Sequence, residues 1–328
     1  MTVEEYIKLL QKILNRGDSK LDNMLISYER ELLKNYEEVL KEIKSEIAAG
    51  FEKYGEKRNE WIKYNRLTNI ENQIAEQIST LTNRNIETTS NGIMSMFRES
   101  YYRTGFALES TIKTSLGFGL LDTKTVSASL VNDFDRVGWV KKMELDSDLY
   151  NNILKNELSQ GLTRGSGYVK IAKAINDKTF GPNPAKKIKG AAYKTLRTVR
   201  TEGHRAQSAS RVLAFGDSKA AADRLGIEFK RTWLSTLDSN TRDDHWAMQG
   251  KSPGEDGKYT FPDGIKTDGP GLSGVLEQDV NCRCTETAKI GGSGLTKIRD
   301  NQEKGLFDYD PEELRKYKNY DDWKKGLK

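Results

Sequence analysis

The residues of this chain best suited to binding a metal are few. It has two histidines and two cysteines, and all four lie in its second half: His204, His245, Cys282 and Cys284. Structural zinc sites take four such ligands in a tetrahedral arrangement. On a β-strand, the two thiols of Cys282 and Cys284 would point to the same face. We therefore expect a structural zinc site at His245, Cys282 and Cys284, with His204 as a further candidate. The alternative is a pair of small, half-buried cysteines, because the spacing is not that of a zinc finger.

Positive charge is concentrated between residues 186 and 211, where the only acidic residue is Glu202. The cations are Lys186, Lys187, Lys189, Lys194, Arg197, Arg200, Arg205 and Arg211. Such a cluster is typical of phosphate-backbone binding, because each contacted phosphate releases counterions. We predict non-specific binding of double-stranded DNA by these residues. The alternative is a helix face whose cations pair with acidic helices from the first half of the chain.

The motifs of common enzyme classes are incomplete. Gly250-Lys251-Ser252 resembles the end of a phosphate-binding loop, but His245 stands where that loop requires its first glycine. No Gly-x-Ser-x-Gly nucleophile motif occurs. The one Glu-x-Glu, Glu29 to Glu31, lies far upstream of where an ADP-ribosyltransferase would carry it. The sequence therefore predicts no enzyme and no catalytic residue.

One acidic cluster leaves a second interpretation open. Asp238, Asp243 and Asp244 precede His245, a combination that a metal-dependent nuclease could use. Carboxylates clustered in a loop are more often helix caps and solvated charge. A soluble DNA-binding or DNA-processing factor of this kind is the alternative to a structural protein.

Hydrophobic residues spaced three or four apart predict long helices in the first half. One stripe comprises Leu21, Leu25, Tyr28, Leu32, Tyr36, Leu40, Ile43 and Ile47, and a second comprises Leu67, Ile70, Ile74, Ile78 and Leu81 with a continuation to Tyr101. We expect a break at residues 15–18, with Asp18 as the N-cap of the first striped helix. Each stripe covers one face only, which predicts packing in a bundle or against a partner.

The second half of the chain has more turn-forming residues and more strand-like segments than the first half. Two prolines and a glycine at 181–184 predict a boundary, followed by a basic helix from Ala185 to about Phe215. Residues 228–235 alternate like a strand, and residues 280–290 predict another. Between Gly250 and Gly274 lie seven glycines and three of the six prolines, which indicates a long loop with a short hairpin near 258–261.

The predicted fold is therefore mainly α with a smaller α+β C-terminal domain: long amphipathic N-terminal helices, then a basic helix followed by short strands and a Gly-rich loop. The predicted divisions are 1–180, 185–290 and a linker with a charged tail at 291–328, which we expect to be loosely tethered. The remaining 34 residues after Gly294 are too few for an added enzyme domain.

Composition excludes other classes of protein. Of 328 residues, 53 are Lys or Arg and 48 are Asp or Glu, a net charge of +5. No hydrophobic run approaches the roughly 20 residues of a membrane span, so we expect no membrane partner. Glu4 and Glu5 make the N-terminus unlike a signal peptide. Two cysteines do not make a disulfide scaffold.

The second domain resembles the Mu F-like family of phage minor head (head morphogenesis) proteins over about residues 185–290. The resemblance follows the family's order of residues. It begins with Arg200, Thr201 and Glu202, continues through Trp233, Asp238, Thr241, Arg242, His245, Gly250, Phe261 and Pro270, and closes on Asn281-Cys282-Arg283-Cys284. The closing four residues after Asp-x-x-Thr-Arg-x-x-His are the specific part.

The resemblance implies a component of the head of a tailed double-stranded DNA phage. It implies location at the portal vertex, in the virion and in the host cytoplasm during assembly. The implied role is procapsid assembly and DNA packaging or ejection, with portal, scaffolding and major capsid proteins as partners. Within the fold, we expect Arg242 to pair with Asp238 or Glu202, Trp233 to pack under the Gly-rich loop, and the two cysteines to pin the last strand near His245.

Overall fold

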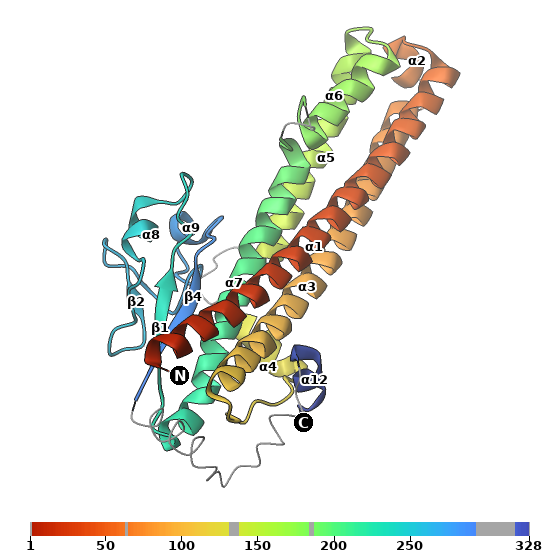
Figure 1. The fold of residues 1–328 in the computed structure, drawn as a ribbon. Helices are drawn as coiled ribbons and strands as arrows, with labels where there is room; N and C mark the ends of the chain where they lie inside the picture. Colours follow the sequence, from red (N-terminus) through yellow and green to blue (C-terminus); the bar gives the residue numbers. More distant parts are fainter. Residues whose placement is uncertain (1, 63–64, 131–137, 184–186, 293–318, 328) are drawn as a thin grey trace. The chain divides into compact units, whose positions relative to one another are not determined.

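The computed structural model describes residues 2–62, 65–130, 138–183, 187–292 and 319–327, and it is mainly α (Figure 1). Its helices are α1 (Val3–Tyr54), α2 (Arg58–Ile62), α3 (Arg66–Ile112), α4 (Thr123–Leu130), α5 (Trp139–Thr163), α6 (Tyr168–Phe180), α7 (Gly190–Arg224), α8 (Asp243–Ala247), α9 (Leu276–Asp279) and α12 (Tyr320–Lys325). Its strands are β1 (Glu228–Leu234), β2 (Tyr259–Thr260), β3 (Lys266–Thr267) and β4 (Thr285–Gly291). The predicted fold class is confirmed.

The first helix is longer than the sequence pattern predicts. α1 continues through residues 15–18, so the expected break and the N-cap role of Asp18 are wrong. Gly17 remains helical where the side chain of Arg103 lies close, since a Cβ built on Gly17 would be 3.4 Å from the Cβ of Arg103. The carboxylate of Asp18 accepts instead from the side chains of Gln207 and Arg211. A glycine within a helix is tolerated when a neighbouring element packs on it.

The two predicted stripes are buried along one side of α1 and α3, apart from Tyr28, which is half-buried. Gly92 lies on the inner side of α3, where a Cβ would be 3.1 Å from the ring of Tyr28. α5 buries Leu154 and Leu158, and α6 buries Ile171 and Ile175. The basic helix differs, because it begins at Gly190 rather than Ala185. Gly190 has a φ of 71°, and a Cβ there would clash with the carbonyl oxygen of Lys178.

The chain forms two compact units, each assembled from separate segments. One unit comprises Met1–Leu25, Ile93–Asp135 and Thr201–Lys328, and the other comprises Ile26–Gly92 and Arg136–Arg200. We refer to them as the mixed unit and the helical unit. The domain boundaries predicted at residues 180, 185 and 290 divide the chain by sequence pattern, and they stay predictions. Residues 293–318, which hold most of the predicted linker and tail, lie outside the described residues.

The helical unit buries its stripes against one another. Segments of α1, α3, α5, α6 and the start of α7 lie side by side in it (Figure 1). Its core combines Leu40, Ile43 and Ile47 with Ile74 and Leu158 and closes around the fully buried Trp61. These side chains come from helices that are far apart in sequence. The hydrophobic stripes of α1 and α3 are therefore covered by other helices of the same chain.

The mixed unit has a helical core of its own, and the end of the chain belongs to it. Trp323 of α12 is 2% exposed and packs its ring near Phe106 and Phe118, with its indole N–H donating to Glu109 over 2.7 Å. The expectation of a loosely tethered tail is therefore wrong for α12. An aromatic anchor buried with its polar atom satisfied can dock even a six-residue helix.

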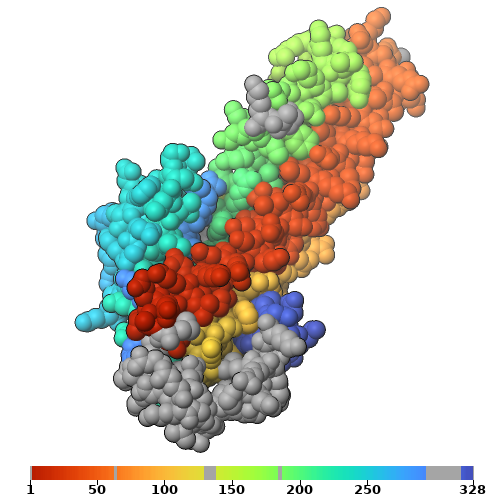
Figure 2. Space-filling model, in the orientation of Figure 1, coloured from red at the N-terminus to blue at the C-terminus, as the bar shows by residue number. Residues whose placement is uncertain are grey.

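Two small antiparallel sheets complete the mixed unit. β1 pairs with β4, so that Trp233 lies opposite Glu286, and β2 pairs with β3 inside the Gly-rich loop. The strand at 228–235 and the short hairpin are confirmed. The strand predicted from residue 280 begins only at Thr285, so both cysteines precede it. In Figure 2, the cyan atoms, which include α8 and part of the Gly-rich loop, lie at the surface.

Candidate metal centre

Two short segments of the mixed unit bring the predicted metal ligands together. His245 lies on α8, which follows β1 through a turn held by Asp238 and Thr241. Cys282 and Cys284 occupy the extended segment that leads into β4. Asn281, immediately before them, adopts a left-handed φ of 56°, and its backbone N–H donates to the hydroxyl of Thr201 over 3.3 Å. This turn directs both thiols toward α8.

The three side chains form one buried cluster. His245, Cys282 and Cys284 are 2%, 4% and 6% exposed, and their ligand atoms all lie within 4.8 Å of one another. Nδ1 of His245 is 3.4 Å from Sγ of Cys284 and 3.7 Å from Sγ of Cys282. Both thiols therefore face one nitrogen of the same imidazole ring. The predicted grouping of these three residues is present in the structure.

The other nitrogen of the ring is held by a polar chain that the sequence does not reveal. Nε2 of His245 lies 2.9 Å from Oε1 of Gln278 on α9, and the amide nitrogen of Gln278 donates to Asp244 over 2.5 Å. Since the amide oxygen of Gln278 can only accept, Nε2 carries a proton; when the ring is neutral, Nδ1 therefore presents its lone pair to the thiols. Glutamine belongs to no recognised metal motif, so no sequence signal could have found Gln278.

Aromatic rings enclose the cluster. Trp233 is fully buried, with ring centroids 5.3 Å from Tyr259 and 5.4 Å from Phe261, both in the Gly-rich loop. The imidazole of His245 lies 5.2 Å from Phe261 and 6.0 Å from Trp233. The expectation that Trp233 packs under this loop is confirmed. These rings cover part of the cluster and contribute to the low exposure of its three ligand side chains.

The ionisation of the cluster is strongly shifted. The hydrogen bond from Cys282 and then the imidazole lower the pKa of Cys284, while the same thiol pair and burial raise the pKa of Cys282. Burial alone would lower the pKa of His245, but the hydrogen bond and charge of Cys284 offset burial and raise it. The opposite shifts mean that Cys284 loses its proton before Cys282 does.

His204 lies outside this cluster. It does not belong to the group of side chains that could share an ion in the described part of the chain. Its surroundings are Asp22, Gln207, Arg283 and Asp18, and burial lowers its pKa. The structure therefore assigns the predicted metal set to three residues and separates the second histidine from them.

In the turn before α8, the charged residues have other partners than those predicted. Asp238 forms a bidentate ion pair with Arg283, one arm of which measures 2.8 Å. This pair and the backbone N–H of Asn240 hold the pKa of Asp238 below its usual range. Arg242 donates instead to the carbonyl oxygens of Gln278 and Val280. The expected pairing of Arg242 with Asp238 is wrong, because Arg283 occupies that carboxylate.

The carboxylates considered for a nuclease serve this same local structure. Asp238 is held by Arg283, and Asp244 accepts from the backbone N–H of His245 and from Gln278. Among the described residues, the group able to share an ion consists of His245 and the two cysteines, without these aspartates. The arrangement therefore favours a thiolate-rich centre over a carboxylate-rich one.

Several residues of the basic helix are engaged by carboxylates within their own unit. Lys194 lies 2.9 Å from Asp146, Arg205 lies 3.0 Å from Glu202, and Arg200 contacts both oxygens of Glu29 at 2.5 and 2.9 Å. Arg211 is buried and donates to Asp18, Thr285 and the carbonyl of Glu286. Lys187 and Lys189 are exposed, Arg197 is half-buried, and Lys186 lies outside the described residues.

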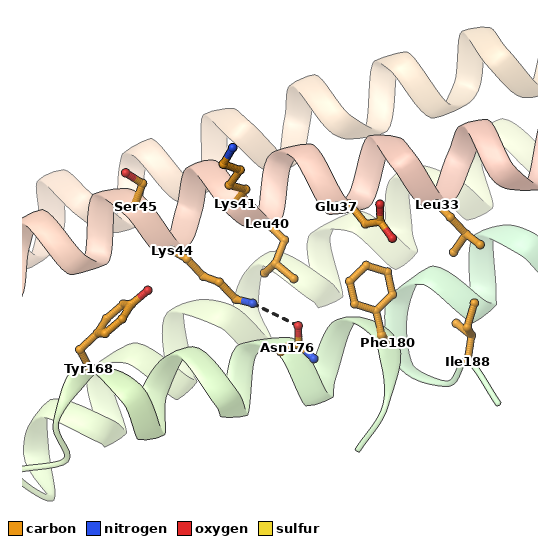
Figure 3. Close-up of a pocket in the computed structure, with 10 residues that line it drawn as sticks. All are labelled: Leu33, Glu37, Leu40, Lys41, Lys44, Ser45, Tyr168, Asn176, Phe180 and Ile188. Carbon is orange, nitrogen blue, oxygen red and sulfur yellow. Dashed lines mark hydrogen bonds between the residues drawn. The ribbon is translucent and has the colours of Figure 1, made fainter. Parts of the chain in front are cut away.

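The described part of the helical unit also contains a groove. It has a volume of about 740 Å³ and lies between α1 and α6 near the start of α7. In Figure 3, Leu33, Phe180 and Ile188 gather at one end, and Lys44 donates to Asn176 over 3.1 Å near the middle. The groove thus combines hydrophobic side chains with the charged Glu37, Lys41 and Lys44.

Comparison with known proteins supports the family resemblance. Residues 152–287 match the family described as Phage Mu protein F like protein. The "Minor head protein GP7" of Bacillus phage SPP1 is 28% identical over 316 residues, which cover 95% of this chain and 96% of that protein. These matches confirm the resemblance to Mu F-like minor head proteins, and the family match begins upstream of the predicted residue 185. They support a structural role in head morphogenesis.

A second relative carries an enzyme name. The "NAD(+)--arginine ADP-ribosyltransferase EFV" of Enterococcus faecalis is 30% identical over 261 residues, which cover 76% of this chain and 48% of that protein. The chain thus spans about half the length of this relative. No solved structure matches the chain. None of the described helices is both long and hydrophobic enough to cross a membrane.

Proposed function

We propose that this Mu F-like chain is a minor structural protein of a tailed-phage head and takes part in head morphogenesis. The observation that carries the proposal is the alignment with the SPP1 minor head protein, which spans nearly all of both chains. The alignment therefore spans the long helices as well as the segments of the candidate metal centre. A protein that is similar along its whole length to a head component is best explained as a head component.

The finer part of the proposal is the place of action. Portal vertex, procapsid assembly and DNA packaging or ejection are implied by the family, with portal, scaffolding and major capsid proteins as partners. The groove between α1 and α6 is the described surface best suited to such a contact, because hydrophobic Leu33 and Ile188 are partly accessible beside Lys41. The protein would then act in the host cytoplasm during assembly and remain inside the virion.

Quantitative mass spectrometry of purified procapsids and virions tests the structural role. We expect a few copies per particle in both. Absence from both, with the major capsid protein readily detected, would overturn the proposal. In the same particles, Lys41→Glu should reduce incorporation, whereas Lys20→Glu, an exposed lysine on α1 away from the groove, should not. Equal incorporation of both variants would exclude the groove as the contact.

The DNA-binding part of the proposal now rests on Lys187 and Lys189, which are exposed and precede α7. Each phosphate contact that they make would contribute about 0.9 to the slope of log affinity against log salt. We expect the Lys187→Glu, Lys189→Glu double variant to lower that slope by about two, and Lys219→Glu, which is exposed and pairs with Asp223, to leave it unchanged. No salt-dependent binding by the unaltered protein would end this part of the proposal.

We do not propose ADP-ribosyl transfer for this chain. The two acids of its Glu-x-Glu are engaged within the helical unit, where Glu29 pairs with Arg200 and Glu31 accepts from Thr88 over 3.2 Å. Incubation with labelled NAD⁺ and arginine-containing acceptors tests this directly. We expect no transfer of label, and transfer that Glu31→Gln abolishes would overturn the expectation.

A further inference from the structure

We propose that His245, Cys282 and Cys284 bind one zinc ion through Nδ1 and the two Sγ atoms, with Gln278 and Asp244 positioning the histidine. The inference goes beyond the head-assembly role, because it concerns a property of the isolated chain. It rests on the distances within the cluster, on the donor set and on the direction of the imidazole ring.

The spacing of the three ligand atoms fits tetrahedral zinc. With Zn–S bonds of about 2.3 Å and a Zn–N bond of about 2.0–2.1 Å, a regular tetrahedron has S–N edges of about 3.6 Å. The two S–N separations here are 3.4 Å to Cys284 and 3.7 Å to Cys282. Both S–N separations are therefore close to those of a zinc site, and all three ligand atoms lie within 4.8 Å of one another.

The donor set selects zinc among common ions. Two thiolates and an imidazole are soft and borderline ligands, which zinc accepts and which magnesium and calcium do not prefer. The charges of two thiolates also balance the charge of a divalent ion, so the filled site carries no net charge. Neutrality matters here because all three ligands are buried beneath Trp233 and Phe261.

The hydrogen bonds that Gln278 and Asp244 form behind His245 resemble those that hold metal-bound histidines in place. Metal-bound histidines donate their second ring N–H to an oxygen, which fixes the ring and its tautomer. Gln278 supplies that oxygen at 2.9 Å, and Asp244 in turn orients the amide of Gln278. This support directs Nδ1 of His245 at the two thiols, an orientation that a histidine with only a packing role does not need.

The described residues supply three ligands of this kind, which leaves one tetrahedral position. A Cys₂His set completed by a water molecule is a known zinc arrangement. We assign the fourth position to water. The main consequence is structural: the ion would tie α8 to the segment that leads into β4, across a stretch of about 40 residues that is otherwise rich in glycine.

Metal analysis of the purified full-length chain tests the proposal. After expression with zinc and gel filtration, we expect one zinc per chain, and cobalt exchanged into the site should show a thiolate-to-cobalt charge-transfer band. Cys282→Ser and Cys284→Ser should remove both signals, whereas His204→Asn, which changes the other histidine, should retain them. Less than 0.1 equivalent of zinc in the unaltered protein and no cobalt band would overturn the proposal.

Gln278→Leu provides a test that does not depend on ligand loss. Removing the outer hydrogen bond of a metal-bound histidine costs about 10–100-fold in metal affinity. We therefore expect zinc affinity, measured by competition with a chromophoric chelator, to fall within that range while the far-ultraviolet circular dichroism stays native. Unchanged affinity would contradict the positioning role of Gln278. Because no phage particle is involved, failure here is distinct from failure of the head-assembly proposal.

Discussion

Arg211 shows why the charge of a residue does not by itself reveal its role. In the sequence it is one of eight cations in a basic segment, and nothing distinguishes it from Lys194. In the structure its side chain is 3% exposed and its guanidinium meets Asp18, Thr285 and the carbonyl of Glu286, which lie on α1 and β4. Arginine suits such a position, because its planar fork donates in several directions at once.

The first prediction compares these two cations. Arg211→Met should destabilise the protein by about 1.5–3 kcal/mol, because it removes a buried guanidinium and leaves the half-buried carboxylate of Asp18 without its charged partner. Lys194→Met should cost about 0–1 kcal/mol, because the ion pair with Asp146 is partly exposed at 36% and 27%. Chemical denaturation of the two variants measures the difference. Equal costs would show that Arg211 does not hold α7 to its neighbours.

His204 gives a prediction about pH. Burial lowers its pKa, the carboxylates of Asp22 and Asp18 act in the opposite direction, and Arg283 adds to the lowering. The unfolded chain therefore binds a proton on this residue at a higher pH than the folded protein does. Stability from neutral His204 is complete above the ordinary value of about 6.5 and is lost as pH falls below it.

The corresponding measurement is the free energy of unfolding between pH 7.5 and 5.5, with zinc present throughout. His204→Asn should have a shallower decline toward acid than the unaltered protein. Both proteins keep the cluster at His245, so that its titration contributes equally to the two curves. Parallel curves would mean that His204 has the same proton affinity in the folded and unfolded states.

At the level of elements, close helix packing depends on particular glycines. Gly161 of α5 lies against α6, where an added Cβ would be 2.4 Å from Cγ1 of Ile171. Gly216 of α7 is also within a helix, but it is exposed and an added Cβ would meet nothing within 4 Å. The same residue type thus permits contact in one helix and serves no packing purpose in the other.

This contrast predicts opposite effects of one substitution. Gly161→Ala should destabilise the helical unit by about 1–3 kcal/mol, because the extra methyl group overpacks the contact between α5 and α6. Gly216→Ala should stabilise α7 by up to about 1 kcal/mol, since alanine has the higher helix propensity. Thermal unfolding followed by circular dichroism measures both. A stabilising Gly161→Ala would show that the two helices can separate freely.

At the level of the whole molecule, each unit is assembled from segments that are distant in sequence. α12 is the clearest case, since a helix of six residues at the end of the chain packs on α3 of the mixed unit. Trp323 provides the hydrophobic contact, and Lys324 lies 2.6 Å from Glu99. The C-terminal residues therefore belong to the core of the mixed unit.

The last prediction concerns this docking. Trp323→Ala should destabilise the mixed unit by about 3–5 kcal/mol, because it removes a large buried ring and leaves Glu109 without the indole donor. Hydrogen exchange should then increase first in α12 and in residues 93–112, with little change around the core of Ile43 and Ile74 in the helical unit. A uniform increase over both units would show that they unfold as one.

The sequence alone determined the local features of this protein. Residue spacing predicted the buried faces of α1 and α3, strand β1 and the hairpin, because burial on one side of a helix or strand imposes a period on neighbouring residues. Residue type predicted that His245, Cys282 and Cys284 would meet, since few other side chains here bind soft metals. The closing Asn-Cys-Arg-Cys also indicated the family.

Tertiary structure decided the rest, because its contacts join residues without a shared local pattern. In the folded chain, Arg200 and Arg211 form ion pairs with carboxylates of α1. Asp238 pairs with Arg283 rather than Arg242, and His204 lies apart from the metal cluster. Gln278 lies behind His245. A glutamine or arginine follows no period that reveals its partner, so only the folded chain shows which of them is structural.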